Sequence, residues 1–216
     1  MNPLHPHPDQ LIVFARYPQA GLVKTRMIPA LGEEGAAELH RQLVERLMQQ
    51  LQPVIAQQKL QLNLHYTGGS KEQMKQWLGS DIIFFPQQGN DLGERMIHAL
   101  KSAQKQGTAH TIMVGSDCPA VDADIITQAH EQLLHHDLVL GPAVDGGYYL
   151  IGINSRIQAS KQKQLFTTIA WGTADVFSQT LEKAQNAGLA CFILPTLHDI
   201  DRPEDLEYFN YHARAQ

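Results

Sequence analysis

Apolar positions along the chain follow two periods in turn, one typical of buried strands and one typical of amphipathic helices. Leu11 to Ala15 form a short apolar run, and from Gly35 to about Gln58 the apolar side chains fall on one helical face. Pro53 lies inside that helical pattern, where proline removes a backbone hydrogen bond, so we expect a kink or an end there. The chain therefore opens with a predicted strand and helix.

The same alternation continues to the end of the chain. Further strands are predicted at QLNLHYT (61–67), IIFFP (82–86), HTIMVGSD (110–117), DLVLGPAV (137–144), GYYLIGI (147–153) and ACFILP (190–195). Helices are predicted at 71–78, 92–106, 123–136 and 174–187, and in a terminal segment whose first turn holds Pro203. Asp91 and Glu94, three residues apart, suit the first turn of the helix that begins at 92.

This order predicts an α/β fold, in which a mostly parallel central sheet is covered by helices and one antiparallel hairpin joins 137–144 to 147–153. The sequence shows no internal repeat, linker or low-complexity segment. We therefore expect a flexible N-terminal tail at residues 1–10 and a single domain at residues 11–216.

Composition narrows the functional classes. The chain has 216 residues and 43% apolar residues, enough for one core, and its formal charge of -5 disfavours a nucleic-acid partner. Two cysteines without a CxxC pair, no signal-peptide pattern and no membrane-length apolar segment predict a reduced, cytoplasmic protein without a membrane span. Eleven histidines are present. His5 and His7 lie in the tail and His135 and His136 are adjacent, so no histidine-built metal motif is recognised.

Candidate chemistry lies directly after the predicted strands, where ligands bind in open α/β sheets. The first strand is followed by cationic and small residues, namely Arg16, Gly21, Lys24, Thr25 and Arg26. Carboxylates lie at the ends of two other strands: Asp117, beside Cys118, at the end of the strand at 110–117, and Asp199 and Asp201 after the strand at 190–195. Phosphate oxygens require paired positive charge and a divalent cation requires hard oxygen ligands, so this pattern suits a nucleoside diphosphate with a cation. Each of these charges could instead lie on a solvated loop.

The segment PQAGLVKTRMIP (18–29) lacks the GxxxxGK[ST] spacing, and no GxGxxG follows the first strand. Neither a Walker-type ATPase nor a standard dinucleotide-binding fold is supported.

Six segments between residues 12 and about 206 carry a resemblance: FARYPQAGLVKTRM, QQGNDLGERM, VGSDCPAV, GPAVDGGYYLIGI, AWGTADVF and HDIDRPEDL. In this order they resemble a bacterial family of small GT-A-fold glycosyltransferases, formerly a domain of unknown function and often associated with arsenosugar-type biosynthesis. The pattern is also similar to 2-phospholactate and molybdenum-cofactor guanylyltransferases. The resemblance implies a nucleotide-diphospho-sugar transferase-like, three-layer α/β/α fold.

The resemblance also implies roles for residues. Asp117, together with Asp199 or Asp201, would hold a divalent cation, Mg²⁺ or Mn²⁺, on the diphosphate. Lys24 and Arg26 match residues that face the phosphates, with Arg16, Gly21 and Thr25 on the same loop. The base or ribose would lie near two further residues of the match, Asp91 and Arg95.

The turn DGGYY and Trp171 each allow two interpretations. Asp145 and Gly146 could simply form the tight turn of the hairpin, or Gly146 and Gly147 could admit a sugar while Asp145 serves as the base for an acceptor hydroxyl. Trp171 could stack on a sugar or base, or belong to the core. Cys118 is expected to be a small buried thiol.

We therefore expect a transferase that moves a sugar from a nucleotide-diphosphate sugar to a small acceptor. A nucleotidyltransferase that releases pyrophosphate is the first alternative, since it needs nearly the same charges, and a non-catalytic nucleotide-sugar-binding protein is the second.

Overall fold

The computed structural model describes residues 8–211, so residues 1–7 of the predicted tail lie outside the described residues. The strands are β1 Gln10–Arg16, β2 Gln61–Thr67, β3 Ile83–Pro86, β4 His110–Gly115, β5 Leu138–Pro142, β6 Tyr148–Asn154 and β7 Cys191–Ile193. The helices are α1 Ile28–Gln58, α2 Lys71–Leu78, α3 Leu92–Lys105, α4 Ala123–Leu133, α5 Ala159–Phe166 and α6 Val176–Asn186, with two 3-10 helices, η1 Thr25–Met27 and η2 Pro203–Tyr208.

The seven strands form one sheet in the order β3-β2-β1-β4-β6-β5-β7. β6 pairs antiparallel with both β4 and β5, while the other neighbouring strands pair in parallel. The predicted α/β class, with a mostly parallel sheet and one antiparallel hairpin, is confirmed. Because six strands point the same way, their carboxyl ends meet at one edge of the sheet, where ligands bind in such folds.

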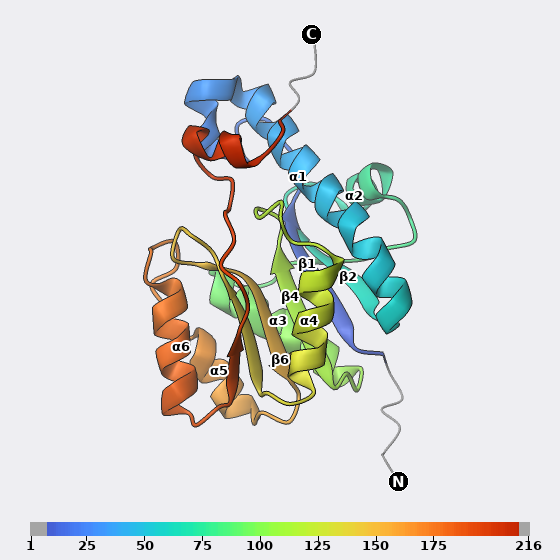
Figure 1. The fold of residues 1–216 in the computed structure, drawn as a ribbon. Coiled ribbons are helices and arrows are strands. Elements are labelled where there is room, and N and C mark those ends of the chain that lie inside the picture. Colours follow the sequence, from blue (N-terminus) through green and yellow to red (C-terminus); the bar gives the residue numbers. More distant parts are fainter. Residues whose placement is uncertain (1–7, 212–216) are drawn as a thin grey trace.

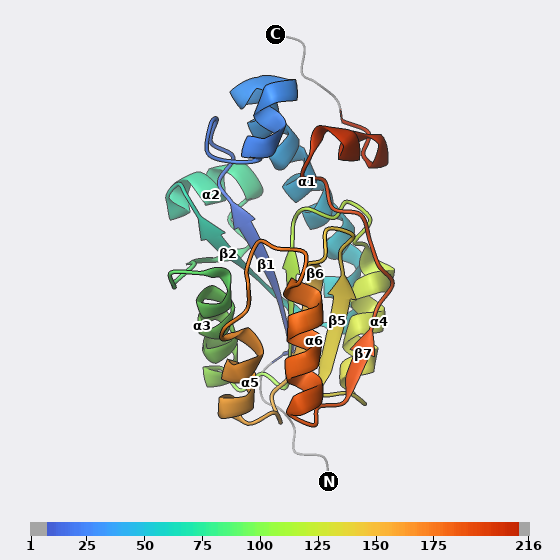
Figure 2. The same ribbon diagram turned by 90° about the vertical axis from the view of Figure 1, so that its left-hand side faces the viewer.

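Helices cover both faces of the sheet and give three layers (Figures 1 and 2). Alternate residues of β1 point to opposite faces, so Leu11 and Val13 enter one core and Ile12 enters the other. The first core is completed by α1, α2 and α4, and the second by α3, α5 and α6. Both faces are thus buried, as expected for a mostly parallel sheet.

A third, smaller core lies beyond the carboxyl ends of the strands. There Leu39 and Leu43 of α1 pack with Ile200 and Phe209, and the early part of α1 lies beside η2 (Figure 2). This packing holds the C-terminal segment, including Asp199 and Asp201, above the edge of the sheet where the strands end.

Of the two outcomes expected at Pro53, an end of the helix is excluded: α1 continues to Gln58, and the interior residue with non-helical backbone angles is Gly32. Buried Leu51 and Val54 on either side of Pro53 anchor the helix in the core. Two other local predictions differ from the structure. The terminal element η2 is a 3-10 helix, and α5 was not predicted because ASKQKQLF has too few apolar positions to show a period. None of the described helices is both long enough and apolar enough to span a membrane.

Candidate functional site

A cleft of about 610 Å³ opens at the carboxyl ends of β1 and β4, beside the turn between β5 and β6. Most of the predicted site residues line it: Arg16, Lys24, Thr25, Arg26, Arg95, Asp117, Asp145, Gly147, Trp171, Asp199 and Asp201. Gly21, Asp91 and Gly146 are not part of the lining. Residues separated by up to 185 positions in the sequence therefore share one cavity, because their segments all end at the same edge of the sheet.

The loop after β1 brings a buried cation into the cleft. Val23 is buried and fixes the loop, and Lys24 adopts a left-handed backbone with φ 46°. Lys24 Nζ lies 2.8 Å from Asp117 Oδ1 and also donates to the Ile200 carbonyl, while its side chain is only 4% exposed. A non-glycine residue in this conformation is held there by its surroundings, and such strain clusters at functional sites.

Asp117 follows β4 and offers a carboxylate to the cleft. Its side chain is 51% exposed despite the ion pair with Lys24. Partial burial acts to raise its pKa, but its neighbours, Lys24 first among them, outweigh that effect, so the pKa of Asp117 lies below its ordinary value. Asp117 is therefore ionised at neutral pH, and one of its oxygens is left for a ligand.

The C-terminal segment carries two more carboxylates into the cleft. The Ile200 amide donates to the Asp117 carbonyl (2.8 Å), and the Val144 amide donates to the Leu197 carbonyl (3.0 Å), which lays this segment along β4 and the hairpin. Asp201 forms an ion pair with Arg26. Asp199 forms no salt bridge with any described residue, and burial together with the charge of Asp145 raises the pKa of its carboxyl.

The hairpin turn has the plain structural role that DGGYY allows. The Gly147 amide donates to Asp145 Oδ1 at 2.7 Å, and Gly146 has φ +89°. A Cβ on Gly146 would lie 2.1 Å from the Ala174 carbonyl oxygen, so this glycine is required by the neighbouring loop of the protein itself. Asp145 still faces the cleft, so the turn explains the glycines without removing the carboxylate from the site.

An aromatic wall closes another side of the cleft. Trp171 and Tyr148 both line it and meet edge to face, with ring centroids 6.4 Å apart. Gly93 makes room for this arrangement, because a Cβ there would lie 2.9 Å from Trp171 Cζ2. The half-buried Trp171 is thus both a core residue and a surface of the cavity.

Two predicted nucleotide contacts take up structural roles. Asp91 caps α3 by accepting from the Glu94 amide at 2.8 Å, as the spacing predicted, and Gly21, at φ +76°, belongs to the turn after β1. Arg95, one turn into α3, reaches the cleft, where its Nε donates to the Gly89 carbonyl at 3.2 Å.

Cys118 is 3% exposed, which confirms the expectation of a buried thiol, and burial raises the pKa of this thiol above its ordinary value.

Sequence reasoning did not single out several polar residues of the lining, among them His40, Thr67 and Gln87. Thr67 ends β2 and Gln87 follows β3, so the rule that ligands bind after strands would have found both. His40 lies in the middle of α1, where nothing in the sequence marks it. Its Nε2 contacts the Arg16 carbonyl at 2.9 Å, and burial lowers its pKa.

The ionisable groups of the cleft balance in number. Four cationic side chains line it, from Arg16, Lys24, Arg26 and Arg95, and four carboxylates, from Asp117, Asp145, Asp199 and Asp201. A bound diphosphate would add negative charge that this lining does not offset. Burial, and after it the charge of the neighbouring Asp145, raises the pKa of Asp199.

The carboxylates predicted to bind a metal line one cavity, but their oxygens are not gathered as a ligand set. Among residues 8–211, the group of ligand atoms that all lie within 4.8 Å of one another is a different one, Asp9, His110 and His130. Lys24 and Arg26 hold Asp117 and Asp201 in ion pairs. A cation in the cleft would have to share these carboxylates with the two basic residues.

The fold is that of nucleotide-diphospho-sugar transferases and cytidylyltransferases. The chain is 37% identical to a protein from Desulfovibrio desulfuricans G20 named "putative nucleotide-diphospho-sugar transferase", with a TM-score of 0.83 over 92% of this chain and 84% of that one. Residues 40–173 match the family described as "Uncharacterized protein conserved in bacteria (DUF2064)", and the chain belongs to this family.

More distant structures share the fold. A cytidylyltransferase from Leptospira borgpetersenii serovar Hardjo-bovis (strain JB197) is 14% identical, with a TM-score of 0.55 over 95% of this chain and 89% of that one. Rv0371c of Mycobacterium tuberculosis H37Rv, in a complex with manganese, is 14% identical, with a TM-score of 0.54 over 94% and 97% of the two chains. No curated protein matches the sequence.

Proposed function

We propose that this protein is a transferase that binds a nucleotide-diphosphate sugar in the cleft and transfers the sugar to a hydroxyl of a small acceptor. The observation that carries the proposal is the cleft itself: balanced cations and carboxylates beside an aromatic wall, at the edge where the strands end. The relative from Desulfovibrio desulfuricans supports the donor class through its name. The leaving group would be a nucleoside diphosphate.

The balanced lining supports a requirement for a divalent cation, Mg²⁺ or Mn²⁺. When bound, such a cation would neutralise the diphosphate and stabilise the charge that develops on the leaving group. Asp117 and Asp199 are the ligands we propose, because both line the cleft and Asp199 forms no ion pair with a described residue, while burial and the nearby charge of Asp145 raise its pKa. Asp201 instead positions Arg26, with which it forms an ion pair.

The basic residues of the first loop are proposed to bind the phosphates. Lys24 carries its ammonium into the cleft on a fixed backbone, and Arg16 is oriented by hydrogen bonds from its guanidinium to the Leu22 carbonyl and Thr67 Oγ1. Fixed cations stabilise developing negative charge without first reorganising. Thr25 and Arg26 continue the same loop along the cleft.

The other side of the cleft is proposed to hold the sugar and the acceptor. Trp171 and Tyr148 offer aromatic surface to a sugar or base, beside Gly147 and Arg95. Asp145 is our candidate for the base that takes the proton of the attacking hydroxyl, because it is an exposed carboxylate at the cavity wall.

A nucleotidyltransferase that releases pyrophosphate is the second candidate. Three cations, from Arg16, Lys24 and Arg26, come from the end of β1 and the short segment that follows it, which suits the greater charge of a triphosphate. The two reactions differ in the product that leaves, a nucleoside diphosphate in one case and pyrophosphate in the other.

The first experiment is thermal unfolding with nucleoside triphosphates, nucleoside diphosphates and nucleotide sugars, each with Mg²⁺, Mn²⁺ or chelator. A ligand that binds the native state raises the Tm, so no acceptor is needed. A metal-dependent rise with a nucleoside diphosphate and its sugar supports the sugar transferase. A rise limited to triphosphates favours nucleotidyl transfer, and ligand binding without turnover of any acceptor indicates a binding protein.

A further inference from the structure

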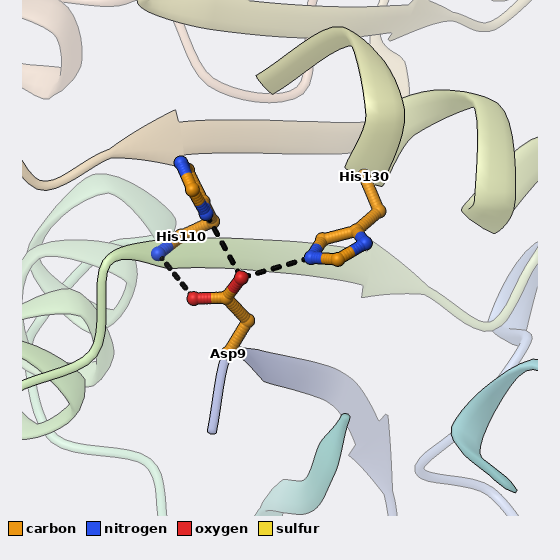
Figure 3. Close-up of side chains that lie close together, drawn as sticks. All are labelled: Asp9, His110 and His130. Atoms are coloured by element: carbon orange, nitrogen blue, oxygen red, sulfur yellow. Dashed lines mark hydrogen bonds and ion pairs between the residues drawn. The ribbon is translucent and has the colours of Figure 1, made fainter. Parts of the chain in front are cut away.

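A second group of polar side chains lies at the opposite end of the sheet from the cleft. Asp9 directly precedes β1, His110 begins β4, and His130 lies on α4 (Figure 3). One carboxylate oxygen, Asp9 Oδ2, lies 2.8 Å from His110 Nδ1 and 2.8 Å from His130 Nε2. No sequence pattern marks this group, because its members are separated by 101 and 20 positions.

We propose that Asp9, His110 and His130 form a binding site for a transition-metal ion of the Zn²⁺ class. One carboxylate oxygen and two imidazole nitrogens form a donor set that Zn²⁺ favours and Mg²⁺ does not. The three ligand atoms all lie within 4.8 Å of one another. With three protein ligands, the fourth position of a tetrahedral ion would be taken by water.

The geometry needs little adjustment to accept the ion. Ligand atoms on a tetrahedral Zn²⁺ lie about 3.4 Å apart, so the 2.8 Å contacts would have to lengthen by roughly 0.6 Å. The two imidazole rings are nearly perpendicular, at 81°, and direct their nitrogens at the same carboxylate (Figure 3). Small side-chain rotations therefore suffice.

The carboxylate and its backbone are already oriented. The His110 amide donates to Asp9 Oδ1 at 2.8 Å, and the Gln61 amide donates to the Asp9 carbonyl at 2.8 Å. Hydrogen bonds of this kind fix metal-binding side chains and strengthen the binding of the ion. This arrangement leaves Asp9 Oδ2 as the oxygen that faces the two histidines.

Access to solvent is partial. The side chains are 20% exposed at Asp9 and 14% exposed at each histidine, so an ion and a water molecule can approach while most of the site stays dry. On binding, each imidazole would offer a lone pair at the nitrogen that now faces Asp9. Its proton would move to the other ring nitrogen or to solvent.

This site would be separate from the cation proposed in the cleft. The seven residues of β1 lie between them, a separation on the order of 20 Å. A metal here would join the start of β1 to β4 and α4, and it would touch no residue proposed to bind the nucleotide. The inference therefore does not depend on the proposed reaction.

The test is Zn²⁺ titration of the full chain, free of any affinity tag and pretreated with chelator, by isothermal calorimetry and thermal unfolding. We expect one equivalent of Zn²⁺ to bind. An excess of Zn²⁺ over protein should raise the Tm by several degrees, and Mg²⁺ should have no comparable effect. Asp9→Asn and His130→Ala are each expected to weaken Zn²⁺ binding more than about tenfold. Absence of Zn²⁺ binding, or undiminished binding by both variants, would overturn the proposal.

Two controls separate this site from other histidines. His98→Ala changes an exposed histidine on α3, and His5→Ala with His7→Ala removes the N-terminal pair; both variants should bind Zn²⁺ as the wild type does. Loss of binding in either would assign the metal elsewhere. Should the site variants fail to fold, the visible spectrum of the Co²⁺-loaded wild type decides: an intense four-coordinate band supports the site, and the weak band of six-coordinate Co²⁺ contradicts it.

Discussion

The two ends of the sheet use carboxylates in different ways. At the carboxyl ends, Asp117 and Asp201 pair with the permanent cations of Lys24 and Arg26. At the amino ends, Asp9 pairs with two imidazoles and a backbone amide. A carboxylate held by lysine or arginine lies in a field suited to phosphate, whereas one held by two imidazole rings lies among ligands suited to a metal.

The pKa shifts follow the same division. Although burial opposes the change, hydrogen bonds from His110 and His130 keep the pKa of Asp9 well below its usual range. Asp199, in the cleft, has a raised pKa because it is buried beside another carboxylate. The amino end is thus an internally satisfied cluster, while the cleft contains a carboxylate pair that a bound cation would relieve.

The largest effect is expected from Asp117→Asn in the cleft. Transfer should fall by about 10²–10³-fold, because the variant removes a carboxylate that would hold the proposed cation and that pairs with Lys24, the two positive charges that would stabilise the leaving group. Product release from a nucleotide sugar measures this loss. Asp124→Asn, at an exposed position on α4, should keep full turnover, and thermal unfolding checks that the cleft variant still folds. Full turnover by Asp117→Asn would remove Asp117 from the mechanism.

His65, a buried histidine, should make the stability of the fold depend on pH in a different way from the Asp9 cluster. His65 contacts the rings of Phe14 and Phe85, and burial lowers its pKa to about 4. Unfolded histidine takes up a proton near pH 6.5. Between about pH 6.5 and 4 the unfolded state therefore binds more protons than the folded state, and the free energy of unfolding decreases as the pH is lowered. The loss attributable to His65 is up to about 3 kcal/mol at pH 4.

His65→Phe should remove this part of the pH dependence, as measured by urea unfolding between pH 7 and 4. The stabilisation by Asp9 behaves differently: its folded pKa is lowered, so the contribution persists above the ordinary value near 4 and is lost only below it. Identical pH dependence of the wild type and His65→Phe would show that His65 is not held neutral.

The assignment of the cleft cation is tested by comparing Asp199→Asn with Asp201→Asn. Asp199→Asn should lower the apparent affinity for the metal by roughly 10–100-fold, as measured from the metal concentration needed to raise the Tm in the presence of nucleotide. The second should retain the metal dependence and lose part of the phosphate affinity, because it frees Arg26. The reverse order would make Asp201 the ligand.

The smallest effect is expected from Asp9→Asn in metal-free protein. Loss of the charge-assisted hydrogen bonds to His110 and His130 should lower the free energy of unfolding by about 2 kcal/mol at pH 7 in urea. Nucleotide binding in the cleft should be unchanged. A loss of nucleotide binding in a folded variant would show that the two ends of the sheet are coupled.

Much of the fold could be predicted from periodicity alone. The alternating apolar patterns predicted all seven strands, and the Asp91–Glu94 spacing predicted the start of α3. Helix α5 was not predicted because the large apolar residues of ASKQKQLF lie only at its end, and α1 does not end at Pro53 because the core on both sides holds the helix together. Local patterns thus predict elements, while packing decides their limits.

For the site, the sequence alone determined which loops matter, because residues that follow parallel strands must gather at one edge of the sheet. Tertiary structure decided the pairing within the cleft: Lys24 with Asp117, Arg26 with Asp201, and Asp199 beside Asp145. It alone brought Asp9, His110 and His130 together, since sheet order places β4 next to β1 although all of α1 through α3 separates the two strands in the chain. Neighbours in space that are distant in sequence leave no periodic signal, so only the folded chain reveals them.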